Sequence, residues 1–202
     1  MLAMMMPGQR ARGGRRNGRG LGDGTGRRAV APGGVDAVDL ATAGLFFSWL
    51  AHDLEEYATM PGHPHPFLRS APFLPEDVRR DGLSRDQVYV ALSAMGLLMA
   101  AASIDGYRTR GRSAFYQSML YGYGMHTFIH LGSAALTRGY TSGCATALPV
   151  VLPFWLFANA ALRSDGVELE PRRWTMAAFP VVALALHGGA YLVTRRWKGA
   201  RP

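Results

Sequence analysis

The fold is decided by the stretch from Leu40 to Tyr57, which reads LATAGLFFSWLAHDLEEY. Residues 40–51 are apolar enough to enter a lipid bilayer, and the residues that follow include a histidine and two adjacent glutamates. On an α-helix with about 3.6 residues per turn, His52, Glu55 and Glu56 share one face. Ionisable groups at membrane depth are costly, so this stretch predicts a functional site whose partners lie elsewhere in the chain.

The positive charge of the chain is concentrated in its N-terminal segment. The net charge is +8 over 202 residues, and residues 1–34 carry seven arginines and one aspartate. This segment is rich in arginine and glycine and has no apolar periodicity, so we expect a disordered basic tail. Because it contains no aromatic residue for stacking, we expect no specific nucleic-acid partner. Its arginines favour the cytoplasmic side of a membrane.

Residues 35–198 predict an all-α fold, a polytopic membrane helix bundle of about five transmembrane helices. The predicted helical segments are residues 35–51 (continuing as helix to 57), 87–104, 113–137, 143–162 and 174–193. A span needs about 20 apolar residues, which the third to fifth segments supply. The first segment is short and contains Asp39, so four crossings remain an alternative. The basic short loops favour five crossings, and we expect the plasma membrane of a bacterium as the location.

Several local features refine this picture. One face of the second segment consists of small residues, which favours close packing against another helix. These residues are Ser93, Gly96, Ala100 and Ser103. Pro149 and Pro153 predict a kink in the fourth segment, and Trp49 is expected as an interfacial anchor near the end of the first. His63 and His65 lie in a proline-rich loop; they could cover the site, but a solvent-exposed loop explains them better.

Four histidines are predicted to lie at matching depth. His126 and His130 are four residues apart, so they share one helix face. His126 and His187 each lie about 20 Å into their segments, at about 1.5 Å per residue. The first, third and fifth segments run in the same direction if all five cross. These histidines and His52 therefore fall in the same half of the membrane.

The predicted metal ligands combine imidazole and carboxylate groups. They are His52, Glu55, Glu56, His126, His130 and His187. This donor set suits a divalent metal ion such as zinc or non-haem iron, and we expect no nucleotide cofactor. Cys144 is the only cysteine, which excludes an intrachain disulfide and thiolate-rich sites. A proton relay or a structural polar cluster is the alternative, and His187 taken alone is better explained by packing.

The spacing His52-x-x-Glu55-Glu56 in a small multi-span protein resembles the HXXEE-domain family. The resemblance extends to Tyr57 and the following Pro-Gly, to residues 126–130 (HTFIH) and to residues 140–147 (YTSGCATA). It covers most of residues 40–195 in layout. The resemblance implies an integral membrane protein and leaves its biochemical function unassigned.

Two catalytic hypotheses follow from the predicted ligands. His52-x-x-Glu55-Glu56 is similar to the inverted zincin pattern, in which His52 and Glu56 would bind zinc, together with a histidine of the third segment. Glu55 would then be the general base of a hydrolysis. Alternatively, the glutamates and histidines would hold iron for an oxidation, as in carboxylate-bridged helix bundles. Either enzyme would act on a lipophilic small molecule that enters between spans from the surrounding membrane lipid.

A proton- or metal-coupled carrier is the third hypothesis, with the His/Glu residues as a relay. Transporters commonly contain inverted repeats, and this sequence shows no internal repeat, which disfavours a carrier. A structural membrane protein with a non-catalytic polar cluster is also consistent with the pattern. The sequence predicts no particular oligomeric state.

Overall fold

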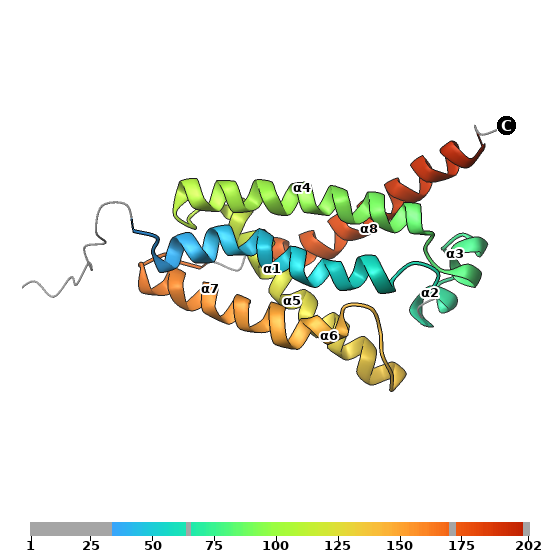
Figure 1. Cartoon of the computed structure of the whole chain (residues 1–202), viewed down its shortest axis with the longest axis horizontal. Helices are drawn as coiled ribbons and strands as arrows, with labels where there is room; N and C mark the ends of the chain where they lie inside the picture. The colour runs from blue at the N-terminus through green and yellow to red at the C-terminus, as the bar shows by residue number, and fades with distance from the viewer. Residues whose placement is uncertain (1–33, 64–65, 170–172, 200–202) are drawn as a thin grey trace, which may run out of the picture. The chain divides into compact units, whose positions relative to one another are not determined.

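The computed structural model describes residues 34–63, 66–169 and 173–199. In these ranges the regular elements are all helices, with no strand among them (Figure 1). The all-α fold predicted from the sequence is therefore confirmed. Residues 1–33 of the predicted basic tail lie outside the described residues.

Five long helical segments make up most of the described chain. They are α1 (Ala37–Thr59), α4 (Arg85–Thr109), α5 (Ala114–Thr137), the continuous segment of α6 (Cys144–Thr146), η1 (Ala147–Val151) and α7 (Leu152–Ser164), and α8 (Arg173–Gly199). Each lies close to a predicted range. The connection between α1 and α4 also contains two short helices that were not predicted, α2 (Pro66–Ser70) and α3 (Glu76–Asp81).

Three of the described helices, not the predicted five, are long and apolar enough to cross a membrane. They are α4, the segment Cys144–Ser164 and, within α8, Ala178–Trp197. α1 contains four acidic residues and a histidine, which lower its mean hydropathy. In α5 the same effect comes from tyrosine, glutamine and histidine. Length and composition thus indicate a membrane protein, but they do not by themselves extend the membrane-spanning set to α1 and α5.

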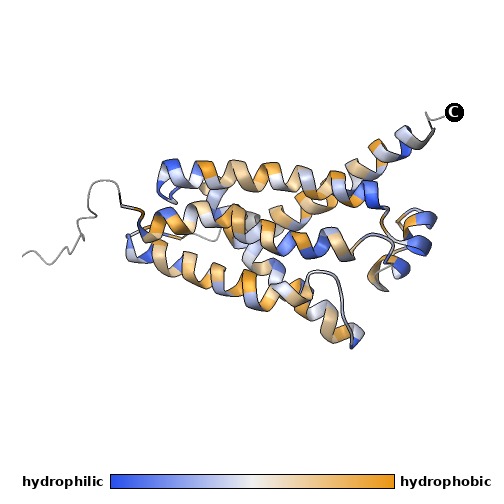
Figure 2. Cartoon of the chain, viewed as in Figure 1, coloured by the Kyte–Doolittle hydropathy of each residue, from blue (hydrophilic) through white to orange (hydrophobic). Residues whose placement is uncertain are grey.

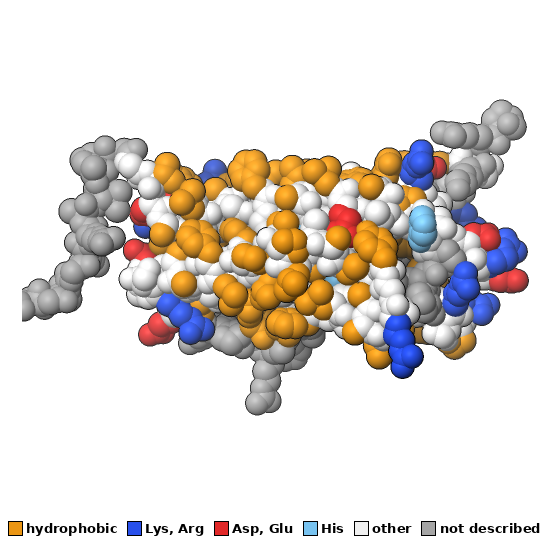
Figure 3. All heavy atoms as spheres, turned by 60° about the horizontal axis from the view of Figure 1, so that its bottom comes forward, with side chains coloured by type: hydrophobic (Ala, Val, Ile, Leu, Met, Phe, Trp, Pro, Cys, Tyr) orange, Lys and Arg blue, Asp and Glu red, His pale blue; other side chains and the backbone are white. Residues whose placement is uncertain are grey.

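The outer surface of these helices is largely apolar. Large apolar side chains are exposed along them, among them Phe47 on α1, Leu97 on α4 and Leu184 on α8. Apolar residues follow every long helix (Figure 2), and charged side chains gather mainly toward the helix ends (Figure 3). Extended exposed apolar surface of this kind is typical of a protein that contacts a membrane.

Side-chain caps define where α1, α4 and α5 begin. Asp36 accepts hydrogen bonds from the backbone N–H groups of Val38 and Asp39, each at 2.9 Å. Ser84 caps α4 and Ser113 caps α5 in the same manner. Such caps satisfy backbone donors that a helix start leaves without partners, and each contributes about 1 kcal/mol.

α1 and α4 pack closely along the predicted small-residue face. A Cβ on Gly96 would lie 2.8 Å from Cη2 of Trp49, so the indole fits only because this position is glycine. The Ser93 hydroxyl forms a hydrogen bond with the Tyr57 hydroxyl at 2.9 Å. The prediction of a packing face is thus confirmed at these positions. The prediction of Trp49 as an interfacial anchor is wrong, because its side chain is 4% exposed and belongs to the core.

The core fixes α5 against α1, the two helices that carry the candidate site. The Tyr116 hydroxyl of α5 donates to the Ala41 carbonyl at 3.0 Å. The Tyr123 hydroxyl forms a hydrogen bond with the Ser48 hydroxyl, also at 3.0 Å. Both tyrosines are fully buried, and these bonds satisfy the polar tips of otherwise apolar side chains.

Ion pairs around Arg110 join the start of α1 to the ends of α4 and α7. The Arg110 guanidinium lies 2.6 Å from Asp36 Oδ2 and 2.9 Å from Asp39 Oδ1. Asp165, at the end of α7, lies 3.8 Å from it. The hydrogen bond from Arg110 lowers the pKa of Asp36. We refer to Arg110 and these three aspartates as the Arg110 cluster.

A kink was predicted at Pro149 and Pro153, and the structure has a π-helical turn that contains Pro149. This turn is η1, which separates α6 from α7. Proline has no backbone N–H to donate, so it interrupts the α-helical hydrogen-bond pattern. Single π-helical turns inside α-helices are frequent at functional sites. The residue directly before η1, Thr146, contacts the site described next.

Candidate metal centre

Four side chains from two helices converge inside the bundle. They are His52 and Glu56 of α1 and His126 and His130 of α5, which we call the His/Glu group. One ligand atom of each lies within 4.8 Å of those of the others. Zinc ligands lie about 2.0–2.2 Å from the ion, so two ligand atoms of a tetrahedral site are about 3.3–3.6 Å apart. The group could therefore hold a metal ion after side-chain movements of about 1 Å.

The three imidazole rings of the group lie edge to face. The ring centroids of His126 and His130 are 4.2 Å apart, and that of His52 is 4.9 Å from His130 and 5.9 Å from His126. His52, Glu56 and His130 are at most 7% exposed. In each helix the two ligands are four residues apart, which places both on the face toward the other helix. The structure thus brings together four of the six predicted ligands.

Glu55 lies outside the group because its carboxylate turns toward the start of α6. It accepts hydrogen bonds from the Tyr140 hydroxyl at 2.5 Å, and from the backbone N–H and the hydroxyl of Thr146 at 2.8 Å and 2.6 Å. Desolvation and then the hydrogen bond to Glu55 raise the pKa of Tyr140, which keeps its hydroxyl protonated as a donor. A role for Glu55 as metal ligand would require these bonds to break.

His130 is held by the loop between α5 and α6. Its Nδ1 lies 2.8 Å from the carbonyl oxygen of Ser142, which can only accept, so Nδ1 is the donor. Nε2 faces Glu56 Oε1 at 3.4 Å. Gly143 follows with φ +83°, and a Cβ at that position would collide with the His130 ring. Glycine is therefore required here both for the backbone conformation and for the approach of the imidazole.

His52 is held by the start of the fourth long segment. Its Nδ1 lies 2.7 Å from the hydroxyl oxygen of Thr146. Its Nε2 is buried and has no hydrogen-bond partner among the described residues. Metal-ligating imidazoles usually bind the metal through one ring nitrogen and form a hydrogen bond through the other, as Nδ1 of His52 does with Thr146.

A cavity of about 740 Å³ adjoins the His/Glu group. Glu56, His126 and His130 form part of its lining, and most of the remaining lining is apolar and comes from α1, α4, α5 and α8. Ile129 and Leu184 line it and are 52% and 71% exposed. The cavity is therefore an apolar space with a polar region at the group, and its lining on α5 and α8 includes accessible apolar side chains.

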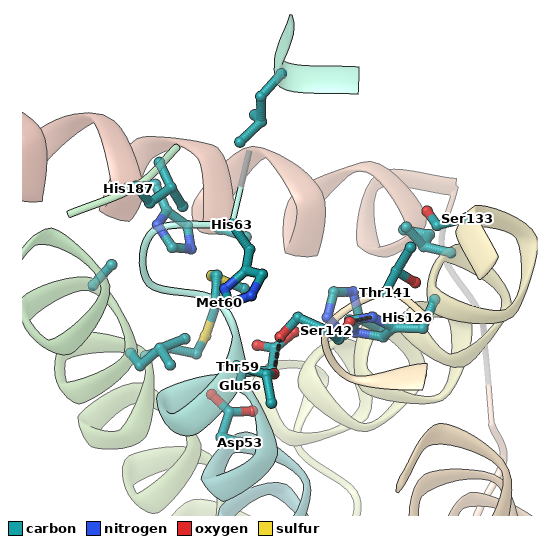
Figure 4. A pocket seen from close by; sticks show the side chains of 18 of the residues that line it. Asp53, Glu56, Thr59, Met60, His63, His126, Ser133, Thr141, Ser142 and His187 are labelled. Carbon is teal, nitrogen blue, oxygen red and sulfur yellow. Dashed lines mark hydrogen bonds and ion pairs between the residues drawn. The ribbon is translucent and has the colours of Figure 1, made fainter. Parts of the chain in front are cut away.

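Two further histidines and one further acidic residue line this cavity (Figure 4). His187 of α8 shares the cavity with the group without being part of it, and its Nδ1 is buried without a hydrogen-bond partner in the described chain. His63 lines the cavity from the loop after α1 and remains an exposed residue, while His65 lies outside the described residues. Asp53 is 3% exposed and was not predicted as a site residue. Its place between His52 and the two glutamates was the only sequence signal for it.

The charge of the site favours a cation. Asp53 and Glu56 line the cavity, whereas the one Lys or Arg in its described lining is Arg69, an exposed side chain. Three imidazoles and one carboxylate form a donor set that zinc and non-haem iron both accept. The His/Glu group could therefore bind a divalent ion next to a space that would accept an apolar molecule.

Comparison with known proteins identifies the family of the chain but assigns it no function. No curated protein and no solved structure matches the chain. A family model described as "Protein of unknown function with HXXEE motif" matches residues 43–158, more than half of the 202 residues. His52, Glu55 and Glu56 supply the motif, and the matched range also includes His126 and His130. The chain therefore belongs to the HXXEE-motif family.

Proposed function

We propose that this chain is a metal-dependent enzyme of a bacterial plasma membrane that acts on a lipophilic substrate. The observation that carries the proposal is the convergence of four ligand atoms within 4.8 Å in the His/Glu group. A divalent ion bound there would act as a Lewis acid toward a polar group of the substrate. Zinc would favour a hydrolysis and iron an oxidation.

The contact between His130 and Glu56 supports a bound cation. With its proton on Nδ1, a neutral His130 presents the lone pair of Nε2 to Glu56 Oε1 at 3.4 Å. Two acceptors that face each other in a buried place repel, and a cation between them removes the repulsion. A metal ion or a proton could supply that charge. The metal is favoured because His52 and His126 bring two further imidazoles to the same point.

We propose that α1 and α5 also cross the membrane, inside a shell formed by the three more apolar segments. The polar groups of α1 are turned inward, as with His52 and Glu56, while Leu40, Phe47 and Leu54 are 54–65% exposed. α5 likewise buries His130 and exposes Leu136 at 75%. Partners inside the bundle offset the cost of polar groups at membrane depth. The arginines of residues 1–34 would place that segment in the cytoplasm.

The substrate class follows from the cavity. An apolar molecule would occupy the space lined by α4, α5 and α8, with its polar reactive group at the His/Glu group. Ile129 and Leu184 would mark a route from the lipid side, because both line the cavity and both have accessible apolar side chains. Asp53, buried beside Glu56 in the lining, is the carboxyl group placed to exchange a proton with the substrate. Glu55 is less suited to act as a general base, because its oxygens already accept hydrogen bonds from Tyr140 and Thr146.

Metal analysis of the detergent-purified protein tests the proposal. We expect stoichiometric zinc or iron in the wild type, and its loss in Glu56→Gln and in His126→Ala. His187→Ala is the matched control, because this histidine lines the same cavity outside the group. If the folded wild type retains neither zinc nor iron(II) after reconstitution, the metal proposal is overturned and a proton relay takes its place.

A further inference from the structure

We propose that Glu55 is a positioning residue that acts on His52 through the Thr146 hydroxyl. The Glu55–Thr146 pair would hold the His52 imidazole with its proton on Nδ1 and the lone pair of Nε2 directed toward the His/Glu group. This inference rests on the proposed metal site and gives the two glutamates of the motif different roles. Glu56 belongs to the group, and Glu55 orients another member of it.

The hydrogen bonds of Glu55 identify it as an acceptor. Its Oε1 accepts from the Tyr140 hydroxyl at 2.5 Å and from the Ala145 backbone N–H at 3.2 Å. Its Oε2 accepts from the backbone N–H and the hydroxyl of Thr146 at 2.8 Å and 2.6 Å. An ionised carboxylate has no proton to donate and room for four such bonds. Each Glu55 oxygen therefore receives two donors.

The direction of the Thr146 hydroxyl then determines the tautomer of His52. A threonine hydroxyl carries one proton, and here that proton points to Glu55. Toward His52 Nδ1, 2.7 Å away, the same oxygen can only accept, so Nδ1 carries the ring proton. In a neutral imidazole the other nitrogen is then an acceptor. That nitrogen is Nε2, which is buried and has no hydrogen-bond partner among the described residues.

The arrangement matches what a metal-ligating histidine needs. A partner behind the ring fixes the tautomer and the ring orientation, and its loss typically lowers metal affinity about 10–100-fold. His130 shows the same geometry by a different route, since its Nδ1 donates to the Ser142 carbonyl. Both histidines are thus held from the segment between α5 and η1, and both direct Nε2 toward the group.

The first measurement does not depend on metal. In metal-free protein labelled with ¹⁵N-histidine, the nitrogen chemical shifts report the tautomer of each neutral ring, and the His52 signals are assigned by their absence in His52→Ala. We expect the Nδ1–H form in the wild type and its loss in Thr146→Val. The Nε2–H form in the wild type would overturn the inference.

The second measurement is the affinity for Co²⁺, titrated through its visible absorption. We expect Thr146→Val to weaken binding about 10–100-fold, with unchanged stoichiometry at saturation. Thr146→Ser keeps the hydroxyl and should retain wild-type affinity, while Glu55→Gln, which accepts fewer hydrogen bonds, should also bind more weakly. Thr42→Val is the control, because the hydrogen bonds of that buried hydroxyl to described residues lie within α1, to the Val38 carbonyl at 2.8 Å and the Asp39 carbonyl at 3.2 Å.

The outcomes separate this inference from the proposed function. If the wild type binds no Co²⁺, the metal site fails, while the tautomer measurement still tests the Glu55–Thr146 contact. If the wild type binds and Thr146→Val binds equally well, the positioning role fails alone. Equal losses in Thr146→Val and Thr42→Val, or no recovery in Thr146→Ser, would show general destabilisation and would also overturn it.

Discussion

At one end of the described bundle, the Arg110 guanidinium lies between carboxylates of α1 and α7. Toward the other end, His52, Glu56, His126 and His130 converge with no lysine or arginine in the group. In the Arg110 cluster the chain itself supplies both signs of charge, with contacts of 2.6 and 2.9 Å. In the His/Glu group the closest pair that could carry opposite charges is His130 and Glu56, at 3.4 Å.

The two regions differ in whether the chain itself supplies the charge that pairs with their polar groups. The Arg110 cluster contains its own cation, which pairs with the carboxylates, so its contribution is to hold helix ends together. The His/Glu group combines buried acceptors, among them His52 Nε2, which has no hydrogen-bond partner among the described residues, and such buried polar atoms reduce stability. Such an arrangement is stabilised when a ligand binds the folded state alone. The two regions should therefore respond to mutation through different observables, metal affinity in one and the free energy of unfolding in the other.

The largest expected effect is on metal binding. His130→Ala should lower Co²⁺ affinity by more than about 100-fold, because loss of a direct ligand exceeds the typical 10–100-fold effect of its hydrogen-bond partners. His63→Ala, in the lining of the same cavity, should leave the affinity unchanged. Competition titration with a chromophoric chelator measures both. Similar affinities in His130→Ala and His63→Ala would contradict the distinction between the His/Glu group and the other residues that line the cavity.

The next effect compares two glycines with positive φ. Gly143 (φ +83°) lies against His130, whereas a Cβ added at Gly166 (φ +71°), near the Arg110 cluster, would meet no neighbouring atom within 4 Å. An alanine in this backbone conformation costs about 1–2 kcal/mol in either place. Gly143→Ala should also displace the His130 ring, so it should be less stable than Gly166→Ala and should weaken metal binding. Thermal unfolding in detergent and Co²⁺ titration test this. Equal melting temperatures and equal Co²⁺ affinities in the two variants would refute the contact between Gly143 and the His130 ring.

A smaller effect is expected from removal of the cation in the Arg110 cluster. Arg110→Met leaves Asp36 and Asp39 without their partner and should lower the free energy of unfolding by up to about 1 kcal/mol, since these side chains are partly exposed. Metal affinity should not change. Arg80→Met is the control, because Arg80 forms an ion pair with its neighbour Asp81 on an exposed surface, and it should have no measurable effect. A loss of metal in Arg110→Met would show that the two regions are coupled.

The smallest effect is on the pH dependence of stability. Because the hydrogen bond from Arg110 lowers the pKa of Asp36 in the folded protein, the carboxylate binds protons less readily there than in the unfolded chain. The contribution of the Asp36 carboxylate to the stability of the folded protein is complete above the pKa of about 3.9 in the unfolded chain. It is lost as the pH falls through the lower pKa of the folded protein. Asp36→Asn should flatten the acid limb of a melting-temperature profile below about pH 4. An unchanged acid limb would exclude this pair as its source.

The sequence predicted the helices and the partners of His52 for physical reasons that can be stated. Apolar runs gave helix positions close to those observed, and the spacing of His126 and His130 at matching depth predicted that they meet α1. Only three of the five predicted segments are long and apolar enough among the described helices to cross a membrane by length and composition, because the polar residues of α1 and α5 lower their hydropathy. The hydropathy of each segment was the sequence signal for this difference.

The sequence motif could not predict that Glu56 belongs to the His/Glu group while Glu55 lies outside it. Adjacent residues on a helix point about 100° apart, so only the rotation of α1 within the bundle decides which one joins the group. The partner that holds Glu55 is Thr146, which lies 91 residues away in sequence. Thr146 lies in the stretch of residues 140–147 that carries part of the resemblance to the HXXEE-domain family, but the stretch does not indicate which side chain Thr146 contacts. Contacts of this kind depend on the packed structure.

The π-helical turn η1 makes this contact sensitive to chain length. A π turn contains about one residue more than an α turn, so it changes the direction of the residues before it relative to those after it. Removal of one residue between Ala147 and Val151 would restore a regular helix and rotate Thr146 by about 100° relative to Ala158 and Leu162, which are buried in the core. A relative one residue shorter in this segment would therefore have to orient the histidine of its motif with a different side chain.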